Sequence, residues 1–130
     1  MADTPLQRIL YAEDETDIQE VASMALEAVG GYEMKICNNG QEAVEAAVAF
    51  NPDLIILDVM MPIMDGPTAL EEIRKLEGFA NIPAIFMTAK VQPQEVAEYI
   101  AMGAVEVIPK PFDPMNLPVT VQAIWERANR

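Results

Sequence analysis

The chain has 130 residues, 52% of them hydrophobic, and carries 21 acidic and 8 basic side chains with no His, for a formal net charge of −13. This length and apolar content predict a single folded domain over residues 1–130 and exclude a disordered chain. The negative charge argues against direct binding to nucleic acid or to an anionic membrane, and no apolar run is long enough to cross a membrane.

The N-terminal stretch lacks the basic and apolar segments of a secretion signal, so we expect a cytoplasmic protein. A single Cys cannot form an internal disulfide, and the absence of His means that any His chemistry must come from a partner.

The first half of the chain alternates strand-like and helix-like patterns. Residues 9–12 form a short apolar block, and apolar residues at helical spacing then run from about Glu15 to the breaker Gly30. Residues 33–36 alternate polar and apolar, and a helical stripe follows over 43–48. The run 54–57 is apolar throughout, which is typical of a strand covered on both faces.

The second half repeats this alternation. A helix opened by Pro67 and ended by Gly78 precedes an apolar strand at 84–87. A helix with a stripe over 96–101 ends at Gly103, and a strand at 105–108 precedes a last helix over 117–128.

Five strands alternating with five helices predict right-handed βαβ units, hence an α/β fold with one parallel sheet and helices on both faces. The strands at 33–36 and 105–108 carry charged residues, and Pro109 closes the latter, so both belong at edges. This patterning favours the doubly wound order 2-1-3-4-5, in which ligands bind at the carboxyl ends of the strands where the chain reverses direction.

Five polar residues follow four of these strands and should converge on that edge: Glu13, Asp14, Asp58, Thr88 and Lys110. Carboxylates brought together repel each other unless one pKa rises or a cation joins them. An all-oxygen site favours Mg²⁺. A divalent cation and a Lys together clamp a phosphoryl group, and a carboxylate between them can be the nucleophile that forms an aspartyl phosphate.

Four ordered motifs resemble one protein family. They are I-L-Y-A-E-D at 9–14, L-I-I-L-D-V-M-M-P-I-M-D-G at 54–66, F-M-T-A at 86–89 and K-P-F at 110–112. From about residue 8 to 130 the chain resembles the receiver domain of bacterial two-component response regulators, of the chemotaxis-regulator type. The resemblance supports the flavodoxin-like strand order given above.

The resemblance implies a phosphoacceptor switch in a phosphorelay. Asp58 would accept a phosphoryl group from a phosphohistidine on a sensor histidine kinase or a histidine phosphotransfer protein. Thr88 would donate a hydrogen bond to a phosphoryl oxygen, and Lys110 would form an ion pair with it. No enzymatic activity is expected beyond self-phosphotransfer and slow autodephosphorylation.

The resemblance also implies the ligands of the cation. Asp14 and Asp58 would bind Mg²⁺ directly, the backbone carbonyl of Met60 would be a further ligand, and Glu13 would act through water.

The expected output is a change in the face formed by the fourth helix, the fifth strand and the fifth helix, coupled to repositioning of Thr88. The 130 residues leave no room for a DNA-binding or catalytic output domain. Signalling should therefore proceed through contacts with a downstream protein, either by this domain alone or as part of a longer regulator or hybrid kinase.

Two departures from the family pattern keep an alternative open. Val107 stands where many receivers have an aromatic residue three positions before the Lys, and Pro109 directly precedes Lys110. A degenerate receiver that binds partners without phosphorylation is therefore the main alternative.

Two rivals from other classes fit the residues less well. A haloacid-dehalogenase-like phosphatase would need a second Asp where Met60 stands. A flavodoxin-like FMN carrier would need a Ser-, Thr- and Gly-rich loop where 13–17 is acidic.

The remaining expectations concern single residues. We interpret Met60, Met61 and Met64 as core gap-fillers in preference to a docking surface, Cys37 as an inert buried thiol, and Trp125 as a core residue. The resemblance favours a cis Lys110-Pro111 bond.

Overall fold

A computed structural model describes residues 5–129 and contains a five-stranded parallel sheet in the order β2-β1-β3-β4-β5. The strands are β1 (Arg8–Ala12), β2 (Glu33–Cys37), β3 (Leu54–Asp58), β4 (Ala84–Thr88) and β5 (Glu106–Pro109). The helices are α1 (Thr16–Ser23), which continues as the π-helix η1 (Met24–Val29), α2 (Gly40–Phe50), α3 (Gly66–Arg74), α4 (Pro93–Ala101) and α5 (Leu117–Ala128). The predicted doubly wound fold class and strand order are confirmed.

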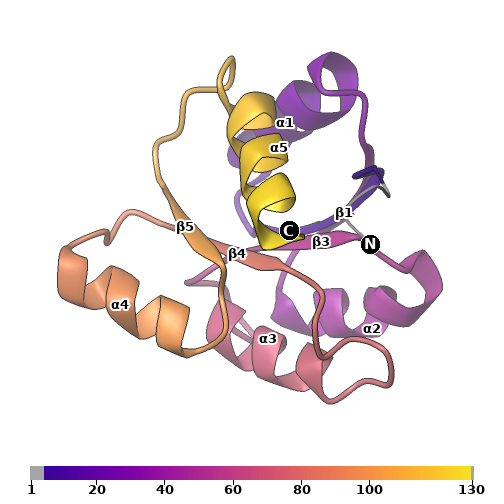
Figure 1. Cartoon of the computed structure of the whole chain (residues 1–130), viewed down its shortest axis with the longest axis vertical. Coiled ribbons are helices and arrows are strands. Elements are labelled where there is room, and N and C mark those ends of the chain that lie inside the picture. Colours follow the sequence, from indigo (N-terminus) through magenta and orange to yellow (C-terminus); the bar gives the residue numbers. More distant parts are fainter. Residues whose placement is uncertain (1–4, 130) are drawn as a thin grey trace.

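The sheet lies between two layers of helices (Figure 1). One apolar core joins the sheet to α1, η1 and α5, and includes Tyr11, Ile56 and Trp125. The other joins the opposite face to α2 and α3, and includes Leu10, Ile55 and Phe86. Every residue of β3 and β4 is buried, which explains why each strand is apolar up to its last residue.

The edge strands follow their sequence patterns. Side chains of β2 alternate between exposed and partly buried, and β5 begins and ends with residues that are not fully buried. Both strands lie at the edges of the sheet, as predicted.

Helices α2 and α3 begin at side-chain caps. The Asn39 side chain accepts a hydrogen bond from the Glu42 N–H at 2.9 Å and starts α2. The Asp65 carboxylate accepts one from the Thr68 N–H at 2.8 Å and starts α3, with Pro67 in its first turn.

The first helix ends at Gly30 as predicted but changes its hydrogen bonding on the way, and α3 ends earlier than predicted. The first helix reaches Gly30 only through the wider turns of η1, where the Gly30 N–H bonds the Ala25 carbonyl at 2.9 Å. Helix α3 ends at Arg74, before Gly78, because Lys75 and Leu76 form tighter bonds to carbonyls three residues back. The spacing of apolar residues does not reveal how many residues each backbone hydrogen bond spans.

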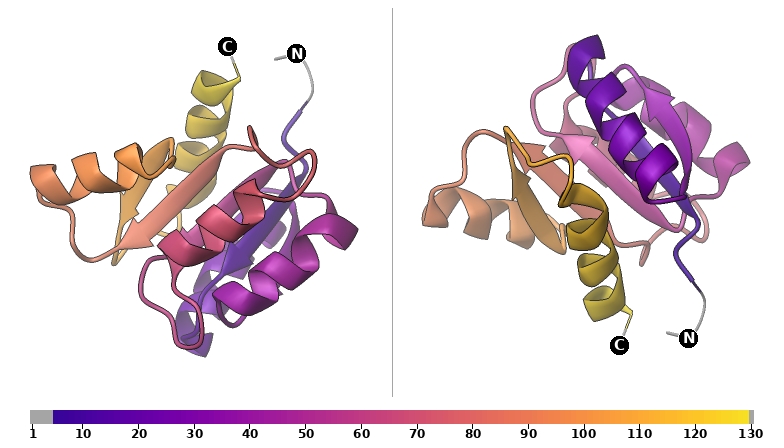
Figure 2. Two further views of the ribbon diagram at one scale, coloured as in Figure 1. Left: turned by 90° about the horizontal axis from the view of Figure 1, so that it is seen from below. Right: turned by 90° about the horizontal axis from the view of Figure 1, so that it is seen from above.

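Helix α4 is packed more loosely than its apolar stripe suggests. None of its residues is fully buried, although Tyr99 packs edge-to-face on Phe86 of β4 with ring centroids 5.5 Å apart. Figure 2 shows α4 beside β5 at the edge of the molecule.

Most single-residue expectations hold. Cys37 and Trp125 are buried, and the Lys110-Pro111 bond is cis. Met60 is the exception: its side chain is 68% exposed, because the chain leaves the sheet after Val59. Met61 and Met64 do pack against the core.

Among residues 5–129, no helix has the length and apolar character required to span a membrane.

Candidate functional site

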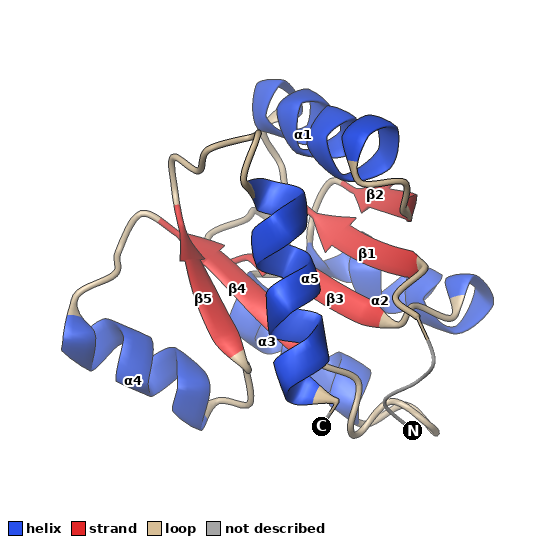
Figure 3. Ribbon diagram, turned by 45° about the horizontal axis from the view of Figure 1, so that its top comes forward, coloured by secondary structure: helices blue, strands red, loops and turns tan. Residues whose placement is uncertain are grey.

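Three carboxylates meet at the carboxyl edge of the sheet, toward which the parallel strands run (Figure 3). Glu13 and Asp14 follow β1, and Asp58 is the last residue of β3. The register pairs Ala12 with Leu57, so the next residue of each strand is brought side by side. One oxygen from each of Glu13, Asp14 and Asp58 lies within 4.8 Å of the others.

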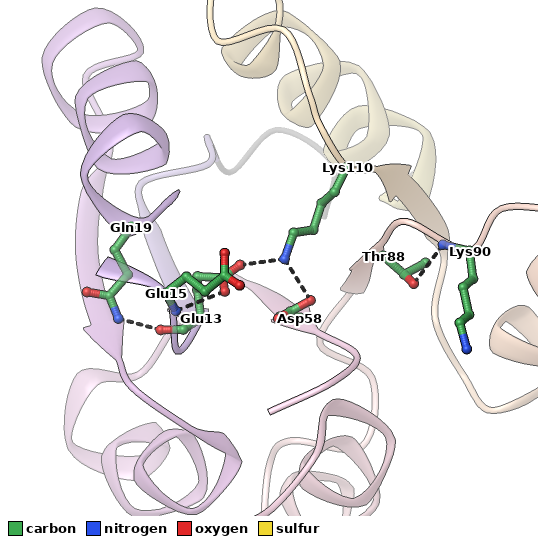
Figure 4. A network of polar contacts seen from close by, with 7 residues as sticks. All are labelled: Glu13, Glu15, Gln19, Asp58, Thr88, Lys90 and Lys110. Atoms are coloured by element: carbon green, nitrogen blue, oxygen red, sulfur yellow. Dashed lines mark hydrogen bonds and ion pairs between the residues drawn. The ribbon is translucent and has the colours of Figure 1, made fainter. Parts of the chain in front are cut away.

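Glu13 is the most deeply placed of the three and is completely buried. Its Oε1 accepts a hydrogen bond from Lys110 Nζ at 3.0 Å, and its Oε2 accepts one from the Glu15 N–H at 3.1 Å. The Gln19 side-chain amide donates to the Glu13 carbonyl (Figure 4). It also donates to Asn38 Oδ1 at 2.9 Å. The start of α1 therefore holds Glu13 in place.

Lys110 bridges two of the acids. Its Nζ lies 3.0 Å from Glu13 Oε1 and 3.2 Å from Asp58 Oδ1, and only 17% of its side chain is exposed. Its backbone N–H donates to the Thr88 carbonyl at 2.9 Å, which ties the end of β5 to β4. The pairing of Lys110 with two acids was not predicted from the sequence.

The charges of the site are incompletely balanced. Burial raises the pKa of Glu13 and of Asp58 above the ordinary carboxyl range, although the bonds from Lys110 oppose this. Burial by itself would lower the pKa of Lys110, but its hydrogen bond to Glu13 and the charge of Asp58 outweigh burial and raise it. One ammonium therefore serves two buried carboxylates, and a third carboxylate adds repulsion.

The donor set fits a hard divalent cation. Glu13, Asp14 and Asp58 supply only oxygen atoms, and two of these residues are buried with raised pKa values. An added double positive charge would relieve this imbalance, and Mg²⁺ requires few protein carboxylates because it keeps several waters.

A hollow of about 210 Å³ opens beside these acids, and five predicted site residues line it: Asp14, Asp58, Met60, Thr88 and Lys110. Glu13 lies beneath it. Thr88 is 5% exposed, and its Oγ1 accepts a hydrogen bond from the Lys90 N–H at 3.0 Å. The structure thus brings together all six residues that the sequence singled out.

Gly66 supports the backbone of Asp58. A Cβ at Gly66 would lie 2.4 Å from the Asp58 carbonyl oxygen, so only Gly allows this close approach. The Gly66 N–H also donates to the Val59 carbonyl at 2.9 Å. The Asp-Gly pair at 65–66 marks this turn in the sequence, whereas nothing in the sequence marks Gln19 as a support of Glu13.

Fold and site together define an α/β domain whose ligand site lies at the carboxyl ends of a doubly wound sheet. Residues 9–122 match the response regulator receiver domain, and the chain belongs to that family of two-component signalling domains.

Known proteins agree with this assignment. The DNA-binding dual master transcriptional regulator RpaA of Synechocystis is 34% identical over 96% of this chain and 52% of its own length. The chemotaxis response regulator CheY4 of Vibrio cholerae superposes with a TM-score of 0.85 at 30% identity, over 92% of this chain and 98% of that one. The receiver domain of the Pseudomonas aeruginosa sensor histidine kinase PA1611, with magnesium in its active-site cleft, gives 0.79 at 30% identity, over 93% and 95%.

The chain spans between a quarter and about half of the length of the curated regulators that it matches first. The shared part is the receiver domain.

Proposed function

We propose that this chain acts as a single receiver domain that accepts a phosphoryl group on Asp58 and signals through protein contacts. One observation carries the proposal: Asp58 is buried to 5% exposure between two further carboxylates and Lys110, at the wall of an open hollow. Such a carboxylate is accessible to a donor from one side and is held in place from the other.

The donor we propose is a phosphohistidine on a sensor histidine kinase or a histidine phosphotransfer protein. An Asp58 carboxylate oxygen attacks phosphorus, the P–N bond breaks, and the imidazole nitrogen leaves with the electron pair and takes up a proton. The donor must come from outside because the chain contains no His. Hydrolysis by water would return Asp58 to the carboxylate, and no other enzymatic activity is proposed.

The ligands proposed for Mg²⁺ are Asp14, Asp58 and the Met60 carbonyl, with Glu13 acting through water. When bound, this ion would neutralise the acids and the phosphoryl oxygens. The magnesium in the PA1611 receiver domain supports the same chemistry here.

Lys110 and Thr88 would hold the transferred group. The Lys110 ammonium, already 3.2 Å from Asp58, would pair with a phosphoryl oxygen, and the Thr88 hydroxyl lines the same hollow and would donate a hydrogen bond to another. The phosphoryl group adds negative charge and acceptor oxygens, and these favour contact of both side chains with the phosphoryl group.

The proposed output surface is the face of α4, β5 and α5. Helix α4 buries no residue completely, and Ile100, Met102 and Val105 are each at least 40% exposed. A loosely packed helix beside an apolar patch can shift at low energetic cost and can dock a protein partner.

Direct contact of this domain with nucleic acid is not part of the proposal, because its net charge is −13. The name of RpaA shows that a receiver-containing relative binds DNA. Any DNA binding by a protein containing this chain would therefore be proposed for a separate domain. A cytoplasmic location is proposed because a phosphohistidine donor is expected there.

Intact-mass measurement after incubation with acetyl phosphate and Mg²⁺ tests the proposal. The wild type should gain one phosphoryl mass, EDTA should prevent it, and Asp58→Asn should gain none. Equal labelling of both proteins would exclude Asp58 as the acceptor. No labelling of the wild type would favour the degenerate alternative, which rests on Val107 lying where an aromatic residue is usual.

A further inference from the structure

Tyr11 carries a polar group that the site described above does not use. It lies in β1, its side chain is completely buried, and its hydroxyl has no hydrogen-bond partner among residues 5–129. Buried hydroxyls are nearly always paired, so an unpaired one calls for an explanation. The apolar core around Tyr11 does not supply one.

The hydroxyl belongs to the acidic edge of the sheet. Side chains two residues apart on a strand point to the same face, so Tyr11 stands next to Glu13 on the face of α1 and α5. The register pairs Tyr11 with Ile56, which stands in the same relation to Asp58 on β3. The pKa of Tyr11 is raised by burial and by the charges of Glu13 and Asp58. It is raised further because the Glu13 carboxylate lies near the hydroxyl, although outside hydrogen-bonding geometry.

Glu13 depends on Lys110 for one of its two side-chain bonds. Lys110 Nζ donates to Glu13 Oε1 at 3.0 Å, and the other oxygen accepts the Glu15 N–H. If Lys110 turns to a phosphoryl group on Asp58, a completely buried carboxylate oxygen loses its donor. An unpaired charged acceptor in the interior is strongly unfavourable.

We propose that Tyr11 is a positioning residue whose hydroxyl donates a hydrogen bond to the Glu13 carboxylate when Lys110 moves to the phosphoryl group. Once Lys110 has left, the Glu13 carboxylate is free to turn toward the Tyr11 hydroxyl, whose hydrogen can rotate to meet it while the ring stays in place. In the unphosphorylated chain Tyr11 is an unpaired donor, and in the phosphorylated chain it pairs with the oxygen that Lys110 has released. Tyr11 thereby favours the phosphorylated state without touching the phosphoryl group.

This inference rests on the proposed function, and the two can fail separately. Tyr11→Phe removes one oxygen atom and keeps the ring. Tyr32→Phe makes the same change where the hydroxyl donates to Gln122 Oε1 at 2.6 Å, and it is the matched control. Both variants and the wild type are titrated with beryllofluoride in excess Mg²⁺, and their urea unfolding is measured in EDTA.

Tyr11→Phe should need about tenfold more beryllofluoride for half-saturation, since a hydrogen bond to a charged group is lost from the bound state only. In EDTA it should unfold at the same urea concentration as the wild type or a higher one, because it loses only an unpaired group. Tyr32→Phe should bind beryllofluoride within about twofold of the wild type.

A second measurement leaves Tyr11 in place. The chain has three tyrosines, so a protein with Tyr32→Phe and Tyr99→Phe retains Tyr11 alone. Its near-ultraviolet tyrosine band should shift to longer wavelength when beryllofluoride and Mg²⁺ are added, as the hydroxyl begins to donate to a carboxylate. An unchanged band, or wild-type half-saturation in Tyr11→Phe, overturns the inference while Asp58 labelling of the wild type upholds the proposed function.

Discussion

Replacing Asp58 with Asn should stabilise the chain in the absence of divalent cations, although it abolishes the proposed reaction. The amide has nearly the shape of the carboxylate and can still accept the hydrogen bond that Lys110 donates to Asp58 Oδ1. It removes one negative charge from a cluster of three carboxylates, two of which are buried.

The magnitude follows from the charges that surround Asp58. At an effective dielectric of about 20, a charge on Glu13 within 4.8 Å repels Asp58 by at least about 3.5 kcal/mol, and Lys110 at 3.2 Å attracts it by about 5 kcal/mol. Asp14 adds a repulsion that is weaker because this residue is exposed. Burial then decides the sign, because it raises the pKa of Asp58, so we expect the neutral amide to be more stable by about 1 kcal/mol.

Urea unfolding followed by the fluorescence of buried Trp125 measures this difference. In EDTA Asp58→Asn should unfold at a higher urea concentration than the wild type. At Mg²⁺ concentrations of about ten times the dissociation constant the wild type should gain about 1.4 kcal/mol and the variant much less, which removes or reverses the order.

Asp53→Asn is the matched control. The Asp53 carboxylate accepts backbone hydrogen bonds from Gln7 at 3.0 Å and Arg8 at 2.9 Å, so its neutralisation should lower stability equally with and without Mg²⁺. The reasoning is refuted if Asp58→Asn is less stable than the wild type in EDTA while the control behaves as described.

Four further predictions follow from the same geometry. Because the pKa values of Glu13 and Asp58 are raised above 4.5 and 3.8, these groups take up protons on folding, so stability in EDTA should rise as pH falls from neutral toward that range. Urea midpoints that fall steadily over this range would contradict it. Lys110→Ala should retain Mg²⁺ binding in a calorimetric titration but lose most of the phosphoryl uptake seen by intact mass. Gly66→Ala should lower stability by about 1–3 kcal/mol, because its Cβ would meet the Asp58 carbonyl, and thermal unfolding checks this. Cys37, whose pKa burial raises to about 11, should resist iodoacetamide at pH 8 until urea is added; rapid native labelling by mass would show otherwise.

The pattern of apolar and charged residues in the strands predicted most of the fold. It did so because the pattern follows the burial of each strand, and burial decides the place of the strand in the sheet. The apolar runs at 54–57 and 84–87 became the central strands, and the charged residues at 33–36 and 105–108 marked the edges. The residues at the strand ends then had to meet, since parallel strands share one carboxyl edge. The convergence of Glu13, Asp58 and Lys110 on one edge needed no further information, whereas the two ion pairs of Lys110 did not follow from it.

Other features depend on how loops, helices and side chains are placed in three dimensions, which the spacing of residues along the sequence does not give. The exposure of Met60 follows from where the loop leaves the sheet after Val59. The loose packing of α4 follows from its place beside an edge strand, since its apolar stripe looks like those of helices that are buried. The unpaired hydroxyl of Tyr11 is recognised only when every neighbour is known, because in the sequence it is one more residue of an apolar strand.

These features are connected by the shortage of positive charge at the acidic edge. The Lys110 ammonium pairs with two buried carboxylates, those of Glu13 and Asp58. A bound cation, or an anion that attracts the ammonium, must therefore alter the bonds of both carboxylates. The Lys110 backbone N–H donates to the carbonyl of Thr88, the last residue of β4. The same strand carries Phe86, against which Tyr99 of α4 packs. A change of partner at Lys110 therefore acts on the two strands next to α4, the helix that buries none of its residues completely. Phosphorylation of Asp58, as proposed above, would therefore bias the position of α4.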